Sequence, residues 1–449
     1  MPEIRAFRAL RYDRAATADP ALVVAPPYDV IDTAEHQRLL ARHPANVVRL
    51  DLPSDEPGDG PDDRYRRVAR TLAGWRSDGT LHKDPHPSIY VYEQTYRVPG
   101  TDIERTQRGY LARLRLEAFG PGSGVLPHER TLAGPREDRY KLLRATGVNT
   151  SPVVGLYDDR DGLGRPILDA LTARPADLDI TIDDGVRHRM WAVPADGDAA
   201  DDVAPLLAFA ARGPVTIADG HHRYETALRY RDERRMTRSC EEDPAFDYVL
   251  MLLLDAAGEP LTVLPTHRLV HGLGDDGIAR LLTGLDQFFE VRREVSAAEL
   301  LERFEASALA DGGAGRFGLW TRTGGALLTA RREVFGPYLP TGGAALRALD
   351  VTLLGIAIDR LTGIGADAVA AGAMTYSKSA TQAVALVDTG AEGAIGTEGA
   401  AGPDAAFLLE PTPVASVLAV AADGDVMPQK STYFYPKALT GLVINPHEW

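Results

Sequence analysis

The segment Pro214-Val-Thr-Ile-Ala-Asp-Gly-His-His-Arg-Tyr224 carries the strongest structural signal in this chain of 449 residues. Residues 214–218 are mostly apolar and β-branched, which predicts a short buried strand. Gly220 then permits a tight turn, and residues 221–235 predict a charged helix. The segment therefore indicates a strand, a turn and a helix in direct succession.

Neighbouring segments extend this pattern to a mixed α/β fold. Residues 247–255 are nearly all apolar, as expected of a central strand that is covered on both faces. We expect this strand to share one sheet with residues 214–218. Residues 88–98 and 106–116 alternate and are rich in β-branched and aromatic residues, which predicts a hairpin. Asp32 or Thr33 can cap a helix that begins near Ala34.

The length of the chain allows two or three domains. Beyond Leu273 the sequence becomes weakly patterned and rich in Gly and Ala, and no repeat of fixed period is present. We therefore predict an N-terminal α/β domain over 1–272 and a C-terminal α/β domain over 273–449.

The charge balance argues against several classes of partner. The chain carries 49 basic and 64 acidic side chains, a formal net charge of −15, without a long basic run. Binding to nucleic acid or to an anionic membrane is therefore not expected, whereas a small anionic ligand can still be held locally. The single cysteine, Cys240, cannot form an intramolecular disulfide and suits a reducing compartment. With no signal peptide and no apolar stretch of about 20 residues, we expect a cytoplasmic protein, with homo-oligomerisation left open.

The turn at Asp219 to Tyr224 has the features of an anion site. Unpaired N–H groups at the start of a helix favour phosphate, and an arginine adds two-pronged donors. The residues predicted to bind phosphate or nucleotide are Gly220, His221, His222, Arg223 and Tyr224. Asp219 is predicted to bind Mg²⁺ or to orient a histidine. Two alternatives stay open: Asp219 caps a solvated helix, or the histidines join ligands from elsewhere in a metal site.

A second cluster, Leu126-Pro-His-Glu-Arg-Thr131, presents a carboxylate beside a histidine on a proline-fixed turn. Glu129 is a candidate general base that can deprotonate a hydroxyl near the phosphate site, with His128 as a catalytic neighbour. The alternative is a surface turn on which Glu129 is solvated.

A third cluster combines Lys430, Ser431, Thr432 and Lys437 with two tyrosines. The lysine and hydroxyl groups resemble one end of a phosphate loop, although the upstream Gly-x-x-x-x-Gly is missing. This cluster can close over a bound anion, or its aromatic residues can be ordinary core. The chain also lacks the zinc-protease His-Glu-x-x-His motif, the Gly-x-Ser-x-Gly elbow, the protein-kinase signature and a well-placed Rossmann glycine triplet.

Four motifs together resemble the bacterial domain-of-unknown-function family 1015. They are Pro26-Pro-Tyr-Asp-Val-Ile31, Pro127-His-Glu-Arg-Thr131, Asp219-Gly-His-His-Arg-Tyr224 and Met427-Pro-Gln-Lys-Ser-Thr-Tyr-Phe-Tyr-Pro-Lys437. The resemblance runs essentially from end to end of the chain.

The Asp219 to Tyr224 turn is also similar to the phosphate-binding turn of the ParB and sulfiredoxin superfamily. His222 and Arg223 match the His-Arg of sulfiredoxin, while His221 replaces its reactive cysteine and excludes sulfiredoxin chemistry. Pro127-His-Glu129 resembles the first box of ParB-like free-serine kinases, which implies that Glu129 activates a serine hydroxyl. The resemblance implies a ParB/sulfiredoxin-like nucleotide-binding core followed by a second α/β region.

These observations lead to one expected function and two alternatives. The expected function is a nucleotide-dependent phosphotransferase that acts on a small hydroxyl metabolite, with free L-serine as the leading acceptor and ATP or ADP with Mg²⁺ as cofactors. Glu129, His128 and Asp219 are the expected catalytic residues, and Lys430 or Lys437 would neutralise developing charge. The alternatives are a phosphatase for phosphoserine-like esters and a non-catalytic, ParB-like nucleotide switch.

Overall fold

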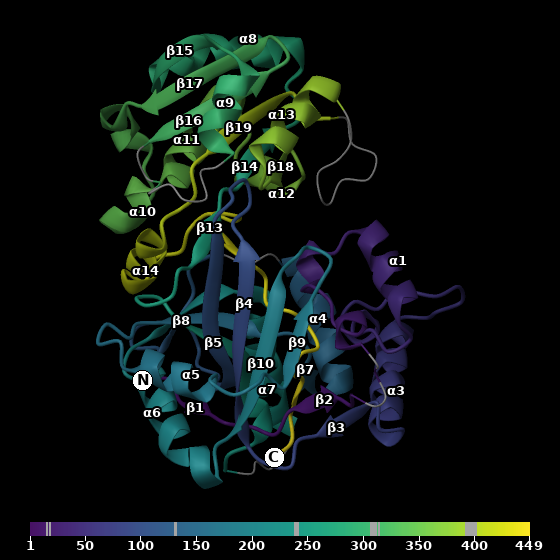
Figure 1. Cartoon of the computed structure of the whole chain (residues 1–449). Coiled ribbons are helices and arrows are strands. Elements are labelled where there is room, and N and C mark those ends of the chain that lie inside the picture. The colour runs from purple at the N-terminus through teal and green to yellow at the C-terminus, as the bar shows by residue number, and fades with distance from the viewer. Residues whose placement is uncertain are drawn as a thin grey trace.

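Two β-sheets organise the chain, one in each half of the molecule shown in Figure 1. The computed structural model describes residues 1–14, 17, 19–129, 133–237, 242–305, 312, 315–390 and 402–449. Cys240, Arg130 and Thr131 lie outside these residues.

The first sheet has nine strands and mixes parallel with antiparallel pairs. In spatial order its path is β6 (Val125–Leu126), β11 (Val215–Asp219), β8 (Val153–Tyr157), β12 (Tyr248–Asp255), β5 (Glu104–Arg115), β4 (Ser88–Arg97), β10 (Arg187–Pro194) and β9 (Leu178–Thr181), with β1 (Ile4–Arg5) also paired to β5. The helices of this half are α1 (Thr33–Arg42), α2 (Val48–Asp51), α3 (Asp63–Ser77), α4 (Ala133–Thr146), α5 (Gly164–Leu171), α6 (Ala200–Ala210) and α7 (His221–Thr237).

The second sheet has six strands, and every pair in it is antiparallel. Its order is β15 (Phe289–Val295), β17 (Gly324–Ala330), β16 (Arg316–Thr321), β19 (Ala405–Leu409), β14 (His267–Val270) and β18 (Met374–Ser377). The accompanying helices are α8 (Gly274–Gly284), α9 (Ala297–Phe304), α10 (Ala344–Ala348), α11 (Asp350–Thr362), α12 (Ala366–Ala370), α13 (Ala380–Thr389) and α14 (Val414–Ala422).

The structure confirms the mixed α/β class and the elements on which it was predicted. Strand β11 passes through Gly220 into α7, and every residue of β12 is buried. These two strands belong to one sheet, with β8 between them. The predicted hairpin is β4 and β5, and Asp32 caps α1 by accepting a hydrogen bond from the Glu35 N–H at 2.7 Å.

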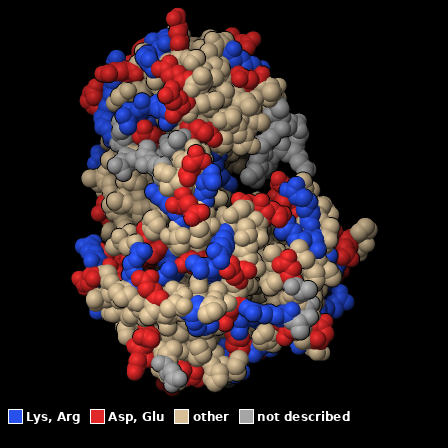
Figure 2. Space-filling model, in the orientation of Figure 1, with Lys and Arg blue, Asp and Glu red and all other residues tan. Residues whose placement is uncertain are grey.

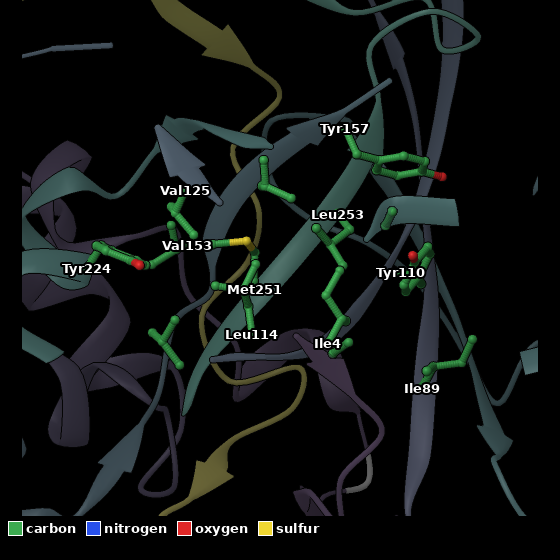
Figure 3. Close-up of a cluster of buried hydrophobic side chains, with 14 of the residues drawn as sticks. Ile4, Ile89, Tyr110, Leu114, Val125, Val153, Tyr157, Tyr224, Met251 and Leu253 are labelled. Carbon is green, nitrogen blue, oxygen red and sulfur yellow. The ribbon is translucent and has the colours of Figure 1, made fainter. Parts of the chain in front are cut away.

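Two hydrophobic layers cover the faces of the first sheet. On one face the strands pack against side chains from α4, α5, α6 and α7, and Figure 3 shows part of this layer, including Met251, Val153 and Tyr224. On the other face the sheet packs against residues from the C-terminal segment, among them Phe434, Leu439 and Val443. The end of the chain is therefore part of the core of the first half.

The chain returns to the first half after the second sheet is complete. A ribbon of β13 (Thr262–Leu264) and β20 (Tyr433–Tyr435) lies between the sheets, and β21 (Asn445–Pro446) pairs with β7 (Val148–Asn149). In Figure 1 this yellow segment runs down through the lower half to the C-terminus. The predicted division at residue 272 stays a prediction. Strand β14, which lies before this residue, joins the second sheet, and residues 433–449, which lie after it, contact the first.

The surface carries charges of both signs. Figure 2 shows basic and acidic side chains interleaved over the visible face of both halves. None of the described helices combines the length with the apolar composition that crossing a bilayer requires.

Candidate functional site

The turn between β11 and α7 depends on glycine. Gly220 has a φ of +89°, a conformation that other residues rarely adopt. A Cβ at this position would lie 3.0 Å from Nε of Arg223. The absence of a side chain therefore lets the Arg223 guanidinium fold back over the turn at the start of α7.

Asp219, the last residue of β11, is paired with two cations. One carboxylate oxygen accepts from Nη2 of Arg223 at 2.6 Å, and the other accepts from Nζ of Lys437 at 2.6 Å. Burial raises the pKa of Asp219, but the charges of Lys437 and Arg223 outweigh it and hold the pKa well below its usual range. Both oxygens thus position cationic side chains, which sets Asp219 apart from a simple helix cap.

Further hydrogen bonds hold Arg223 in place. Its Nη1 donates to Oγ of Ser151 at 2.6 Å and to the carbonyl oxygen of Pro152. The side chain is only 12% exposed. Because β8 begins directly after Pro152, the strand next to β11 fixes the guanidinium at the start of α7.

His128 lies behind the turn and links three segments. Its Nδ1 is hydrogen-bonded to the carbonyl oxygen of Ile217, and its Nε2 lies 2.9 Å from Oγ1 of Thr432. Burial lowers the pKa of His128 to about 4, so the ring is neutral at physiological pH. Since a carbonyl oxygen only accepts, Nδ1 carries the proton and Nε2 accepts from the threonine hydroxyl. This geometry orients the segments and leaves His128 no proton to donate to a ligand.

Glu129 is joined to the C-terminal motif by an isolated parallel bridge to Met427. The N–H of Met427 donates to the carbonyl oxygen of His128 at 2.8 Å, and the N–H of Lys430 donates to the Glu129 carboxylate. Burial raises the pKa of Glu129, and this N–H together with the charges of Lys430 and Arg268 only partly offsets the effect. A raised pKa brings a carboxylate closer to the range in which a general base works at neutral pH.

A cavity of about 180 Å³ brings most of the predicted residues together. Those that line it are Glu129, Asp219, Gly220, His221, His222, Arg223, Lys430, Thr432 and Lys437. The three clusters identified from the sequence therefore meet at one place, although about 90 and 210 residues separate them along the chain.

Three predicted residues do not line the cavity. His128 lies behind the wall, and Ser431 is buried, where its Oγ donates to the carbonyl oxygen of Pro428 at 2.5 Å. Tyr224 points into the core, stacks on Phe119 and donates to the carbonyl oxygen of Glu117 at 2.9 Å. These side chains support the site from outside, because α7 turns its apolar face toward the sheet at Tyr224.

Several lining residues were missed in the sequence. Tyr28 and Asp29 come from the Pro26 to Ile31 motif, which the sequence singled out for its family resemblance but not as part of the site. Tyr376 lies near the end of β18 in the second sheet, and Lys378 follows that strand, inside the Gly/Ala-rich stretch. Composition offered a signal for Lys378: the chain has only five lysines among its 49 basic residues, and three of them line this cavity.

The cavity is locally cationic in an acidic protein. Four cationic side chains line it, Arg223, Lys378, Lys430 and Lys437, against three carboxylates, Asp29, Glu129 and Asp219. Within the described residues no group of three or more histidine, cysteine, aspartate or glutamate side chains is arranged to hold a metal ion. This arrangement suits an anionic ligand and gives no support to a metal site built from protein side chains alone.

Comparison with known proteins gives one family match. A family model described as a protein of unknown function (DUF1015) matches residues 4–352. The sequence matches no curated protein at a significant level.

The chain also resembles solved structures, at low similarity. A free serine kinase in complex with AMP is 13% identical with a TM-score of 0.35 and covers 71% of this chain and 89% of its own. A conserved hypothetical protein from Pyrococcus furiosus is 14% identical with a TM-score of 0.32, and the match covers 69% of this chain and 87% of that protein. SbnI with a C-terminal truncation, from Staphylococcus aureus, is 10% identical with a TM-score of 0.35, and the match covers 74% of this chain and 85% of that protein.

Proposed function

This chain belongs to the DUF1015 family of proteins of unknown function, and we propose that its cavity binds a nucleotide and transfers a phosphoryl group to a small hydroxyl metabolite. The observation that carries the proposal is the meeting of the Asp219 to Arg223 turn, Glu129 and the C-terminal lysines in one cavity.

The phosphate-binding part of the proposal rests on the start of α7. This helix has 17 residues, and its first three residues, His221, His222 and Arg223, line the cavity with their backbone N–H groups at the positive end of the helix dipole. Together with the helix dipole they attract an anion, and Arg223 and Lys437 add charged donors at the same edge of the cavity. Asp219 pairs with both cations and holds them in position.

The acid–base part rests on Glu129. In the proposed reaction the acceptor hydroxyl gives its proton to Glu129 while its oxygen bonds to the terminal phosphorus of ATP or ADP. The bond from that phosphorus to the bridging oxygen breaks, and the shortened nucleotide leaves. Lys430 and Lys437 would stabilise the negative charge that develops on the transferred group and the leaving oxygen.

Mg²⁺ fits this site only together with a nucleotide. Protein carboxylates alone do not form a cage here, but Mg²⁺ commonly takes one or two carboxylates and completes its shell with phosphate oxygens and water. Each Asp219 oxygen keeps a second lone pair beside its contact with Arg223 or Lys437, so Asp219 would be the protein ligand, and the ion would neutralise phosphate charge. The acceptor that we propose first is free L-serine, because Pro127-His-Glu129 resembles the first box of free-serine kinases.

Phosphoryl transfer can be tested directly with purified protein. Incubation with Mg²⁺ and either ATP or ADP, against a panel of hydroxyl metabolites that includes L-serine, should give a phosphorylated product detected by mass spectrometry. Glu129→Gln should bind nucleotide normally and lose turnover. Absence of product across the whole panel would contradict the proposal.

The same assay separates the two alternative functions. Release of inorganic phosphate from phosphoserine without nucleotide would indicate a phosphatase. Tight nucleotide binding without turnover, equal in wild type and Glu129→Gln, would indicate a nucleotide-binding switch.

A further inference from the structure

Lys378 extends into the cavity from the second sheet, unlike the other cationic side chains that line it. It follows β18, whereas Arg223 belongs to α7 and Lys430 and Lys437 to the C-terminal segment. In Figure 1 β18 lies on the side of the upper half that faces the lower half. The second half of the molecule therefore contributes a charged group to a cavity built largely by the first.

Among the ion pairs found in the described residues, none joins Lys378 to a carboxylate, although Asp29 lines the same cavity and its charge favours the ammonium form. Instead Nζ lies 3.7 Å from the ring centroid of Tyr433, and Nζ of Lys437 lies 4.2 Å from the same centroid. Lys437 differs, because it forms an ion pair with Asp219.

Burial, together with the charges of Lys437 and Lys430, lowers the pKa of Lys378 to about 8, and the charge of Asp29 opposes this shift only in part. An ammonium group that is desolvated and repelled by like charges is stabilised when an anion binds beside it. The choice of residue agrees with this, because the chain has five lysines against 44 arginines and yet places an ammonium here. A lysine acts as a compact point charge toward phosphate, whereas the wide guanidinium fork suits bidentate contacts.

We infer that Lys378 binds the distal phosphate of a polyphosphate chain, so that a nucleoside di- or triphosphate is held between the two halves of the molecule. The inference rests on the proposed function in taking the cavity as a phosphate site, and it adds the residue from the second half that binds the end of the phosphate chain. With a single phosphate on the Asp219 to Arg223 turn, Lys378 would have Asp29 as its opposing charge. A longer phosphate chain would supply a second opposing charge.

Calorimetric titration with inorganic phosphate and with tripolyphosphate tests this inference without requiring turnover. Wild type should bind tripolyphosphate more tightly. Lys378→Met should weaken tripolyphosphate binding by roughly tenfold or more, which is the loss expected for one charge-assisted contact. It should weaken phosphate binding by less than about threefold. Lys378→Arg, which keeps the charge, should retain part of the preference. Lys141→Met is the matched control, because Lys141 pairs with Asp62 on the surface.

Proton uptake provides a second readout. Above pH 8 wild type should take up a proton when tripolyphosphate binds, seen as a dependence of the binding enthalpy on the buffer, and Lys378→Met should abolish it. Equal weakening of both ligands in Lys378→Met, or unchanged affinity for both, would overturn the inference. Because these titrations need no acceptor, a failed transfer assay leaves the inference standing. Unchanged binding of both ligands in Arg223→Ala would contradict the assignment of this cavity as the phosphate site.

Discussion

The Nζ of Lys437 lies 2.6 Å from a carboxylate oxygen of Asp219, although 218 residues separate the two along the chain. This ion pair joins the C-terminal segment to the turn between β11 and α7. It also places Lys437 beside Arg223, which binds the other oxygen of Asp219. One carboxylate thus pairs with two cations, and a bound anion would balance the second positive charge.

Lys437→Met should therefore weaken nucleotide binding. The variant removes one charged donor from the cavity but leaves Asp219 paired with Arg223, so the fold should persist with a modest loss of stability. We expect the dissociation constant to rise roughly tenfold, as for the loss of one charge-assisted hydrogen bond. The measurement is a thermal-shift titration with ATP, since bound ligand stabilises by RT ln(1 + [L]/Kd). An unchanged titration would place the ligand elsewhere.

Glu129 should make turnover fall at acid pH. Only the ionised carboxylate can accept a proton, and burial raises its pKa above the ordinary value of a glutamate. Turnover should therefore rise with pH through this raised pKa, and the midpoint should lie above 4.5. Initial rates across pH, with nucleotide saturating, provide the test. Glu129→Gln should lose about 10²- to 10⁴-fold in turnover, and a variant that kept the wild-type rate would exclude Glu129 as the base.

The same carboxylate has a linked effect on folding. Because its folded-state pKa is raised, the contribution of Glu129 to stability is most favourable at low pH and is lost as pH rises through the folded pKa. Asp219 acts in the opposite sense. Its pKa is depressed, so its contribution is present above the unfolded value and is lost as pH falls.

His128 should make the protein sensitive to acid. Its pKa falls from 6.5 to about 4 on folding, so the neutral ring stabilises the fold above pH 6.5 and that stability is lost as pH falls toward 4. The full linkage is on the order of 3 kcal/mol. Urea unfolding at a series of pH values should show this slope, and His128→Asn should reduce it. Buried His188, His267 and His447, each with a pKa lowered to about 3, would keep part of the slope. A variant with the full wild-type slope would contradict the assignment.

The sequence contained local signals for much of this site. The strand, glycine turn and helix at 214–235 were correctly predicted, because β-branched residues, Gly220 and a charged helical run act within one short segment. Glu129, Arg223 and Lys437 were each proposed from local chemistry. Their convergence in one cavity follows from pairings such as Glu129 with Met427, which no local pattern encodes.

Other features depend on contacts that the sequence could not show. Tyr224 stands next to Arg223 in the motif, yet the rotation of α7 turns its ring into the core. Lys378 lies in a Gly/Ala-rich stretch without a recognisable motif, and only the antiparallel pairing of β18 with β14 brings it to the cavity. The return of the C-terminal segment to the first half likewise depends on long-range packing.

Arg113 should control whether the C-terminal segment stays docked. This buried arginine, 1% exposed, donates to Oδ1 of Asn445 at 2.6 Å and to the carbonyl oxygens of Pro446 and Glu448. Arg113→Met leaves these acceptors without their donor in a buried setting, which should cost about 2–4 kcal/mol of unfolding free energy. Denaturant unfolding measures the loss.

Loss of the Arg113 contacts should also reach the cavity, because Lys430 and Lys437 belong to the same segment. We expect amide hydrogen exchange in residues 433–449 of Arg113→Met to accelerate more than exchange in the second sheet. Uniform acceleration over the whole chain would show that Arg113 stabilises the fold generally and does not act through the C-terminal segment.

Among the glycines near the site, Gly220 should tolerate substitution least. At a φ of +89° an alanine is strained by about 1–2 kcal/mol, and its Cβ would press against Arg223. Gly220→Ala should therefore lower stability and displace the guanidinium, which weakens phosphate binding. Gly213, just before β11, is the matched control, because its φ is not positive and a Cβ there meets nothing within 4 Å. Gly213→Ala should leave phosphate binding unchanged and alter stability by less than about 1 kcal/mol. If both variants bound phosphate as tightly as wild type in calorimetry, the folded-back position of Arg223 would not be required for the site.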